Sequence, residues 1–221
     1  MREQIPIQPT PVGALRFNTD IAQLEYFDGN QYVNITTDSP EQNTGGTRGI
    51  FYSGNVSSDN RIQFVNIDTT GDAIDFGDAN QAARVAASFS SRTRCFKAGG
   101  YTDGTGGRDV IEFVTFSSTG NAIDFGNLTT SNRDAGVASD RTRSILFGGS
   151  TPGTPNGDVD IEKMTIASTG NSTDFGGDLI TGVRGVSGVS DRTRAIAVSG
   201  EHTSGDNIMQ YVTIQSSGNA V

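Results

Sequence analysis

STGNAIDFG, residues 118–126, is the stretch that decides the fold, because it recurs along the chain. Similar copies are TTGDAIDFG at 69–77 and STGNSTDFG at 168–176, and a fourth copy begins as SSGNAV at 216–221. Thr-Arg pairs recur in step with these copies, at Thr47-Arg48, Thr93-Arg94, Thr142-Arg143 and Thr193-Arg194. Since the two phrases keep their order and a spacing of roughly 50 residues, the chain contains an internal structural repeat.

Each repeat is predicted to form four short β-strands, because its segments are short, β-branched and interrupted by glycine. In the repeat that opens at Arg133, we expect strands over 134–139, 143–149, 159–167 and 172–175. Tight turns are expected between the first and second strands and between the third and fourth. The residues that we predict to point inside the repeats are Ile111, Val114, Ile145 and Phe147.

A four-stranded repeat of roughly 45–50 residues has the period of a β-propeller blade. The order of features also resembles the kelch repeat, in which an arginine leads a small-residue strand, an apolar strand ends in Gly-Gly, and an aromatic residue lies on the outer strand. The double glycines are Gly99-Gly100 and Gly148-Gly149, with Ser53-Gly54 and Ser199-Gly200 in the other repeats, and Phe76, Phe125 and Phe175 replace the usual Trp. The resemblance implies an architecture and no particular kelch function.

The predicted fold class is therefore all-β, with an N-terminal β-meander arm over 1–37, a linker over 38–46 and four-stranded kelch-like propeller blades over 47–221. The repeat units fall near 47–83, 84–132, 133–183 and 184–221. About three and a half blades are visible, whereas propellers usually have four to eight. We therefore expect the sequence to be the front part of a longer protein; the alternative is a short open stack whose edges a partner covers.

The arm carries a second resemblance. Residues 13–35, GALRFNTDIAQLEYFDGNQYVNI, are predicted to form strands over 14–18, 23–27 and 31–35. This meander resembles a short module of tail-fibre and other virion proteins of tailed phages, through LRFNT at 15–19, LEYFDG at 24–29 and YV at 32–33. The repeat phrases at 114–126 and 164–176 are also similar to repeats in virion proteins of marine phages.

The phage resemblance implies that the arm attaches the protein to a virion and oligomerises, with a trimer favoured. The arm residues expected to contact another chain are Leu15, Phe17, Leu24 and Tyr26. The implied partners are other virion proteins of the tail, neck or fibre. The implied location is the extracellular particle, after assembly in the host cytoplasm.

Composition excludes several other classes. A net charge of −9 argues against a general nucleic-acid binder. No apolar run approaches the ~18 residues of a membrane span, so no membrane insertion is expected. A single cysteine, Cys95, and a single histidine, His202, make a disulfide framework, a zinc site and Ser-His-Asp chemistry improbable. We therefore predict no catalytic residue, no cofactor and no metal, and we expect Cys95 to be a small buried hydrophobe.

Three arginines recur in each repeat, and two interpretations are open. Arg84, Arg133 and Arg184 lead the first strands, at nearly constant distances in sequence from Asp75, Asp124 and Asp174. We expect a structural role, in which these arginines hydrogen-bond those carboxylates or strand-end carbonyls. The alternative is an arginine-lined pocket for sulfated or carboxylated sugars.

The connections between second and third strands vary, whereas the other turns are uniform. These variable loops cover 55–60, 101–108, 150–158 and 201–206. In an up-and-down blade they share one face with the connections between repeats. A rigid scaffold with one variable face is typical of binding proteins. The residues best suited to stack on or hydrogen-bond a glycan there are Tyr101, Arg108 and His202.

Together these patterns predict a structural virion protein of the tail-fibre or appendage type, and not an enzyme. The arm would anchor it, and the repeats would present a surface to a host glycan or protein. Two alternatives stay open: a kelch-type glycan-active enzyme, and a cellular kelch module for protein interaction.

Overall fold

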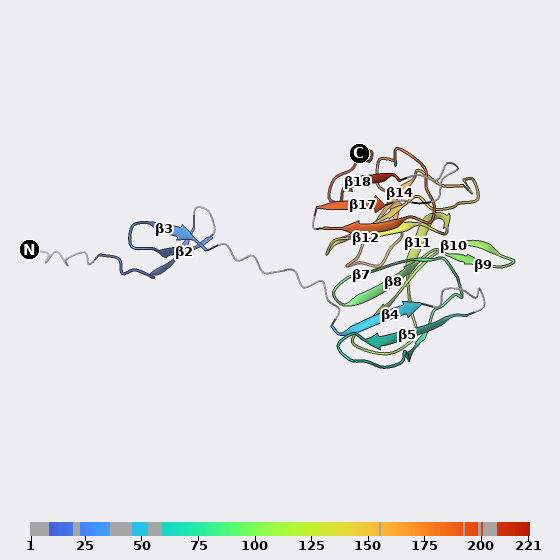
Figure 1. Cartoon of the computed structure of the whole chain (residues 1–221), viewed down its shortest axis with the longest axis horizontal. Coiled ribbons are helices and arrows are strands. Elements are labelled where there is room, and N and C mark those ends of the chain that lie inside the picture. Colours follow the sequence, from blue (N-terminus) through green and yellow to red (C-terminus); the bar gives the residue numbers. More distant parts are fainter. Residues whose placement is uncertain are drawn as a thin grey trace, which may run out of the picture. The chain divides into compact units, whose positions relative to one another are not determined.

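The computed structural model describes residues 9–19, 23–35, 46–52, 59–154, 156–191, 193–198, 200 and 207–221. Within these ranges every regular element is a β-strand, so the all-β prediction is confirmed. The chain divides into two compact units, Met1–Gln42 and Asn43–Val221, which are described separately (Figure 1).

The first unit is an antiparallel meander of β1 (Leu15–Asn18), β2 (Gln23–Phe27) and β3 (Tyr32–Asn34). The predicted strands and their order are confirmed. The turn between β2 and β3 forms because the Asp28 carboxylate accepts the backbone N–H groups of Asn30 and Gln31. These two bonds lower the pKa of Asp28.

The second unit contains four small antiparallel sheets, each built from strands that follow one another in the chain. Sheet I consists of β4 (Arg48–Tyr52), β5 (Arg61–Asn66) and β6 (Ile74–Asp78). Sheet II consists of β7 (Ala87–Ser90), β8 (Arg94–Ala98), β10 (Gly106–Thr115) and β11 (Ile123–Asn132), with β9 (Tyr101–Thr102) paired to the start of β10.

Sheet III consists of β12 (Gly136–Ser139), β13 (Arg143–Phe147), β14 (Ile161–Thr165) and β15 (Thr173–Asp174). Sheet IV consists of β16 (Ser187–Ser190), β17 (Arg194–Val198) and β18 (Met209–Thr213). In the described residues no sheet closes on itself. The variable loop predicted over 101–108 connects β8 to β10 as expected, and within it β9 and the start of β10 pair as a short hairpin.

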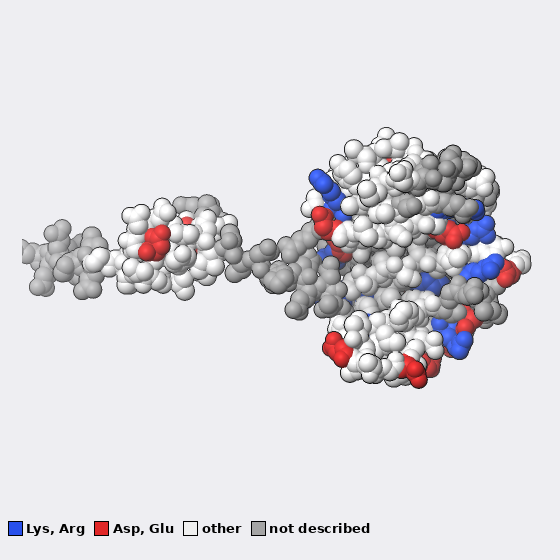
Figure 2. All heavy atoms as spheres, viewed as in Figure 1, with Lys and Arg blue, Asp and Glu red and all other residues white. Residues whose placement is uncertain are grey.

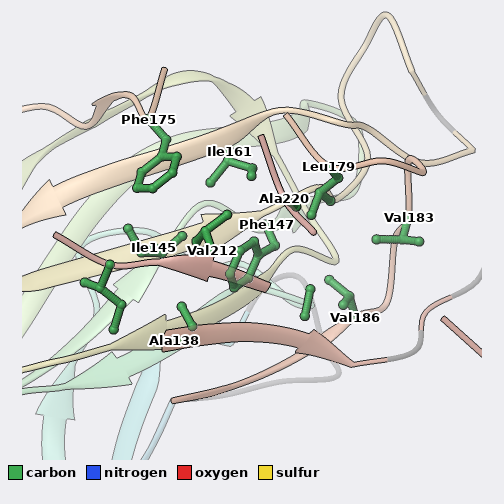
Figure 3. Packing of buried hydrophobic residues seen from close by; sticks show 13 residues of the cluster. Ala138, Ile145, Phe147, Ile161, Phe175, Leu179, Val183, Val186, Val212 and Ala220 are labelled. Carbon is green, nitrogen blue, oxygen red and sulfur yellow. The ribbon is translucent and has the colours of Figure 1, made fainter. Parts of the chain in front are cut away.

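The four sheets pack face to face in chain order, and each neighbouring pair encloses an apolar cluster. Between sheets I and II the cluster includes Ile62, Phe76 and Val114, and between II and III it includes Phe96, Ile111 and Met164. Figure 3 shows the third cluster, in which Ile145, Phe147, Ile161 and Phe175 of sheet III meet Val212 and Ala220 of sheet IV. The predicted inside residues Ile111, Val114, Ile145 and Phe147 are all buried.

A second set of contacts joins the turn before each fourth strand to the preceding sheet. Between sheets II and III, the N–H of Gly170 donates to the carbonyl of Phe125 at 2.8 Å, and the Asn171 side chain accepts the N–H of Asn127 at 3.0 Å. Asn121 and Asn219 make the corresponding contacts at the other two junctions. The recurring phrase therefore forms the same inter-sheet contact at all three junctions.

One buried polar side chain on the third strand completes each junction. Glu112 accepts the N–H of Asn80 at 2.8 Å, Glu162 accepts the N–H of Thr129 at 3.2 Å, and Gln210 accepts the N–H of Ile180 at 2.6 Å. Asn80 and Ile180 follow the fourth strand of the preceding sheet, and Thr129 lies in the second half of β11. Only a hydrogen-bonded polar side chain is tolerated at such depth, and all three satisfy this requirement.

Sheet II adds an ion pair to this scheme. The Lys97 ammonium lies 2.7 Å from Glu112 Oε1 and donates to the carbonyl of Gln81 at 2.6 Å, with both charged side chains almost fully buried. Leu146 and Ala197 occupy the position of Lys97 in sheets III and IV, so the pair is particular to sheet II. Nearby Cys95 is buried as predicted, and desolvation raises the pKa of its thiol to about 12.

The first strands of sheets II, III and IV lie side by side, and small residues allow this approach. The Ser139 hydroxyl donates to the carbonyl of Ser90, and the Ser190 hydroxyl donates to the carbonyl of Ser139 at 2.7 Å. A Cβ on Gly188 would lie 2.1 Å from the carbonyl oxygen of Val137, so only glycine fits there. The small-residue composition of these strands follows from this close packing.

The uniform turns after the first strands are held by a side-chain acceptor. Ser91, Asp140 and Asp191 accept the two backbone N–H groups at the Thr-Arg pair that follows each of them. At Asp191 these two bonds lower the pKa of the carboxyl. At Asp140 partial burial raises the pKa, but the hydrogen bonds from Thr142, Arg143 and Gln215 outweigh it and the pKa is lowered.

The glycine of the D-F-G phrase gives a direct test of the junction. A Cβ on Gly126 would lie 2.3 Å from the carbonyl oxygen of Gly170, at a φ of +150°. Gly120 has a similar φ of +154° but open space around its Cβ position. We expect Gly126→Ala to lower the free energy of unfolding by about 1–3 kcal/mol more than Gly120→Ala, as measured by urea denaturation. Equal losses in the two variants would show that backbone strain, and not the inter-sheet contact, requires the glycine.

Candidate functional site

The two ends of the sheet stack differ in the way that the strand connections predict. At one end, here called the TR end, the turns after first strands lie beside the turns after third strands; the N–H of Ile166, for example, donates to the carbonyl of Thr142. At the other end, the loop end, the β8–β10 connection bonds to the start of its own repeat through Arg84 and Tyr101. The prediction that variable loops and inter-repeat connections share one face is confirmed.

A hollow of about 260 Å³ opens at the loop end, between the β9–β10 hairpin of sheet II and the loop after β13 of sheet III. Its lining residues are Tyr101, Gly106, Gly107, Ser131, Arg133, Ser150, Thr151 and Pro152. The hairpin and the 150–152 segment differ from the corresponding parts of other repeats. Because positions that break the repeat are not needed for the shared packing, this hollow is the candidate functional site.

Tyr101 is the one aromatic residue among the described residues that line the hollow, and two guanidinium groups approach its ring. The Arg133 guanidinium carbon lies 4.5 Å from the ring centroid, and that of Arg84 lies at 5.3 Å. Arg84 also donates to Asp103 at 2.9 Å, and Arg133 Nε lies 3.9 Å from Asp134. The position of Tyr101 at the loop end was thus predictable from the sequence, whereas its contacts with Arg84 and Arg133 were not.

The predicted pairing of these arginines with Asp75 and Asp124 was wrong. The chain between β6 and β7 turns inward at the buried Ala79 and Ala83, and this path carries Arg84 away from β6 and against the β9–β10 hairpin. The residue after each leading arginine is left-handed, with φ values of 52° at Val85, 58° at Asp134 and 60° at Gly185. The chain thus bends into the first strand while the arginine stays at the loop end.

Neither of the other two predicted glycan-binding residues, Arg108 and His202, is among the described residues that line the hollow. Arg108 lies on β10, where its guanidinium donates to the hydroxyl of Thr102 at 3.1 Å and to that of Thr105 at 2.9 Å. Arg108 thus holds the hairpin together and is not part of the hollow's lining. His202 lies outside the described residues, as do 55–58 of the first variable loop and 201–206 of the last.

A second hollow, of about 310 Å³, lies at the TR end and is lined by Ser91, Arg92, Thr93, Arg94, Arg141, Ile166 and Ala167. It is built from the repeated phrases. Other arginines of the Thr-Arg pairs bond strand-end carbonyls of the next sheet: Arg48 donates to Phe116 at 2.6 Å and Arg143 to Ile214 at 2.7 Å. The predicted hydrogen bonds from repeated arginines to strand-end carbonyls are therefore confirmed for Arg48 and Arg143 of the Thr-Arg pairs. The TR end is primarily a packing surface.

The chemistry of the loop-end hollow suits binding. An aromatic ring, a guanidinium and several hydroxyls are the groups that stack on and hydrogen-bond sugars. None of the described residues that line the hollow is a carboxylate, and the described part of the chain contains no cluster of three potential metal ligands. Figure 2 shows positive and negative side chains interspersed on the visible face of the sheet unit, with much of the surface uncharged.

The arm contains a second candidate site, the apolar face of its meander. Leu15 and Phe17 are 64% and 61% exposed, and Leu24 and Tyr26 lie opposite them on β2 with more than a third of their surface exposed. The other face is internally satisfied, because Glu25 accepts from Arg16 at 2.6 Å and from Asn18 at 3.0 Å. The Asn18 and Arg16 bonds lower the pKa of Glu25, and the Arg16 guanidinium lies 3.6 Å from the Tyr32 ring centroid.

No family model matches this chain, and no curated protein matches it significantly. In the described residues no helix is long and apolar enough to cross a membrane.

Arg133 provides a test of the arrangement around Tyr101. Among the described residues its side chain contacts the Tyr101 ring and lies 3.9 Å from the Asp134 carboxylate, so we expect Arg133→Ala to lower the free energy of unfolding by about 0.5–1 kcal/mol. Arg92→Ala, an exposed change at the TR end, is the control in the same urea denaturation series. A loss above about 3 kcal/mol would instead indicate a buried hydrogen-bonded role for Arg133.

Proposed function

We propose that the chain is a structural virion protein of the tail-fibre or appendage type, anchored by its N-terminal meander. The observation that carries this proposal is the exposed apolar face of the meander in the first compact unit. The residues of this face are Leu15, Phe17, Leu24 and Tyr26. The resemblance of the same segment to virion modules of tailed phages supports the assignment.

Energetics favour a role for this face in assembly. A three-stranded sheet of this size has little core of its own and gains stability when its apolar face is covered. Four large apolar side chains exposed together on one sheet face are typical of an interaction surface. Since Arg16, Asn18 and Glu25 satisfy one another on the opposite face, the apolar face is the side that a partner would cover. We assign that partner to other virion proteins, with a homotrimer of arms as the favoured assembly.

The sheet unit is proposed to be a kelch-like β-propeller segment that carries the binding surface. Support comes from the face-to-face packing of successive antiparallel sheets of three to five strands and from the adjacent first strands β7, β12 and β16. In this proposal the loop end faces outward, and Tyr101 and Arg133 contact a host-surface glycan. The lining of the hollow favours such binding over a kelch-type glycan-active enzyme, which would need an acid or base beside the sugar.

Particle incorporation tests the anchoring role. The double substitution Leu15→Ser with Phe17→Ser should abolish incorporation and leave the melting of the sheet unit unchanged, because both substituted residues belong to the other compact unit. Gln23→Ser is the matched control, since this exposed residue lies on β2 in the alternation of the polar face. Immunoblotting of purified particles measures the outcome. Normal incorporation of the double variant would contradict the proposed anchor.

Adsorption to host cells tests the binding role. Tyr101→Ala should reduce adsorption of the purified protein at least tenfold, because it removes the stacking surface of the hollow. Arg92→Ala at the TR end should adsorb normally. Labelled protein and a glycan array report the same comparison with isolated sugars. Unchanged adsorption of a folded Tyr101→Ala protein would exclude the hollow as the binding site.

A further inference from the structure

Arg133 is the one charged side chain among the described residues that line the loop-end hollow. Its Nε lies 3.9 Å from the Asp134 carboxylate, which is beyond hydrogen-bond distance. No other described residue accepts a hydrogen bond from Arg133, although its guanidinium lies against the Tyr101 ring. A guanidinium carries five N–H donors in a fixed, planar fork. Arg133 therefore presents donors for which the described part of the protein supplies no acceptor.

The neighbouring arginines differ from Arg133 in this respect. Arg84 contacts the same aromatic ring but donates to Asp103 at 2.9 Å. Arg108 donates to the hydroxyls of two threonines of the β9–β10 hairpin at 3.1 and 2.9 Å. The side chain of Arg133 is 30% exposed, so a ligand in the hollow can reach it. Because the rest of the side chain is shielded from water, a charged contact made there is stronger than one on an open surface.

A second donor lies on the same side of the strand as Arg133. Side chains two residues apart on an extended strand point to one face, and both Ser131 and Arg133 line the hollow. Asn132 between them is buried, and its amide donates to the carbonyl of Gly148 at 2.7 Å. The Ser131 hydroxyl makes no hydrogen bond with any described residue. The hollow thus has two donors side by side that the described residues leave unused.

The size and composition of the hollow limit what can bind there. Its volume of about 260 Å³ is below the ~300–1,000 Å³ of pockets for drug-sized ligands, so it suits a single sugar ring. Gly106 and Gly107 form the hairpin wall, and a Cβ on Gly106 would have no atom within 4 Å, so this wall leaves room for a ligand. The Thr151 hydroxyl is engaged with Asp158 at 3.0 Å.

We propose that the hollow binds a sugar that carries an anionic group, with Arg133 and Ser131 donating to its carboxylate or sulfate oxygens. This inference rests on the proposed glycan-binding function and names the class of glycan. Bidentate recognition of such oxygens is the contact for which the planar guanidinium fork is best suited. The Tyr101 ring supports the guanidinium through their cation–π contact and adds apolar surface for the sugar ring.

The expected affinity follows from the surroundings of Arg133. The Asp134 carboxylate, 3.9 Å away, offsets part of the positive charge, and a single sugar ring buries little surface. We therefore expect a dissociation constant on the order of 0.1–10 mM for one sugar. An oligomer joined through its arms would bind a surface that displays many such sugars more tightly, because several hollows act together.

NMR titrations of the isotope-labelled full chain with matched sugars test the proposal. The pairs are glucose with glucuronate, galactose with galacturonate, and lactose with 3′-sialyllactose. Glucose 6-sulfate and galactose 6-sulfate separate recognition of a sulfate from that of a carboxylate. At least one acidic sugar should bind about tenfold more tightly than its neutral partner. Its affinity should fall with added salt, and the shifted amide signals should include that of Tyr101.

Substitutions separate recognition by Arg133 from its contribution to folding. Arg133→Gln should weaken binding of the acidic sugar about tenfold and leave binding of its neutral partner nearly unchanged. Arg133→Lys keeps the charge without the fork, so it should retain part of the affinity and serves if the glutamine variant does not fold. Ser131→Ala should weaken binding by less. Arg92→Gln, the same charge change at the TR end, is the control, and melting temperatures show that each variant is folded.

Three results would overturn the inference: equal affinity for both members of every pair, no binding of any acidic sugar up to about 50 mM, or unchanged acidic-sugar binding by a folded Arg133 variant. The proposed function fails separately. Loss of cell adsorption by Tyr101→Ala without any preference for acidic sugars would refute only the class of glycan. Binding of an acidic sugar together with normal adsorption of the Tyr101→Ala protein would keep the inference and contradict the role in host attachment.

Discussion

The contact between a glycine of one sheet and a turn of the next is the constraint on which the sheet stack depends. Gly126 passes so close to Gly170 that a side chain on Gly126 would overlap the Gly170 carbonyl oxygen. At the same point the Gly170 N–H and the Asn171 side chain bond the backbone around Phe125 and Asn127. The turn of each phrase therefore docks on the strand of the preceding phrase. Because one phrase contains both halves of the contact, its S-T-G-N and D-F-G parts must recur together.

This arrangement also explains how a chain with 33% apolar residues builds a core. Small sheets packed face to face need apolar side chains only where two sheets meet, and the remaining cohesion is polar. Glu112, Glu162 and Gln210 reach across the junctions to backbone N–H groups, and these hydrogen bonds offset part of the cost of burying the side chains. The feature that Glu and Gln share at this position is an acceptor oxygen, and the charge of Glu112 is in addition paired with Lys97.

Much of the fold was predictable from sequence because the chain contains several copies of one structural unit, and each copy gives the same pattern of strands and turns. Strand order, buried positions such as Ile145 and Phe147, and the sharing of one end by variable loops and inter-repeat connections all followed from alternation and spacing. The β9–β10 hairpin did not, because its glycines are equally typical of an irregular loop. The partners of Arg84 also escaped prediction, since a separation of nine residues from Asp75 does not reveal that the connection turns into the core at Ala79.

The same repetition determines where ligand recognition can occur. Most positions of the repeat are needed for folding. The Thr-Arg pairs and their acceptors close one set of turns, and the glycine and asparagine of the S-T-G-N phrase join neighbouring sheets. The small residues of the first strands allow these strands to approach closely. A change at any of these positions would damage a junction as well as a surface. The connections between second and third strands share only a short backbone bridge at their start, Arg84 with Tyr101 and Arg133 with Ser150 in the described residues, so the side chains and length of the rest are free to differ. Tyr101 occupies one of these connections, and its ring lies beside two arginines that the repeat already holds at the loop end. A single repeat-breaking residue placed beside invariant ones is thus enough to create a distinctive surface on an otherwise uniform scaffold.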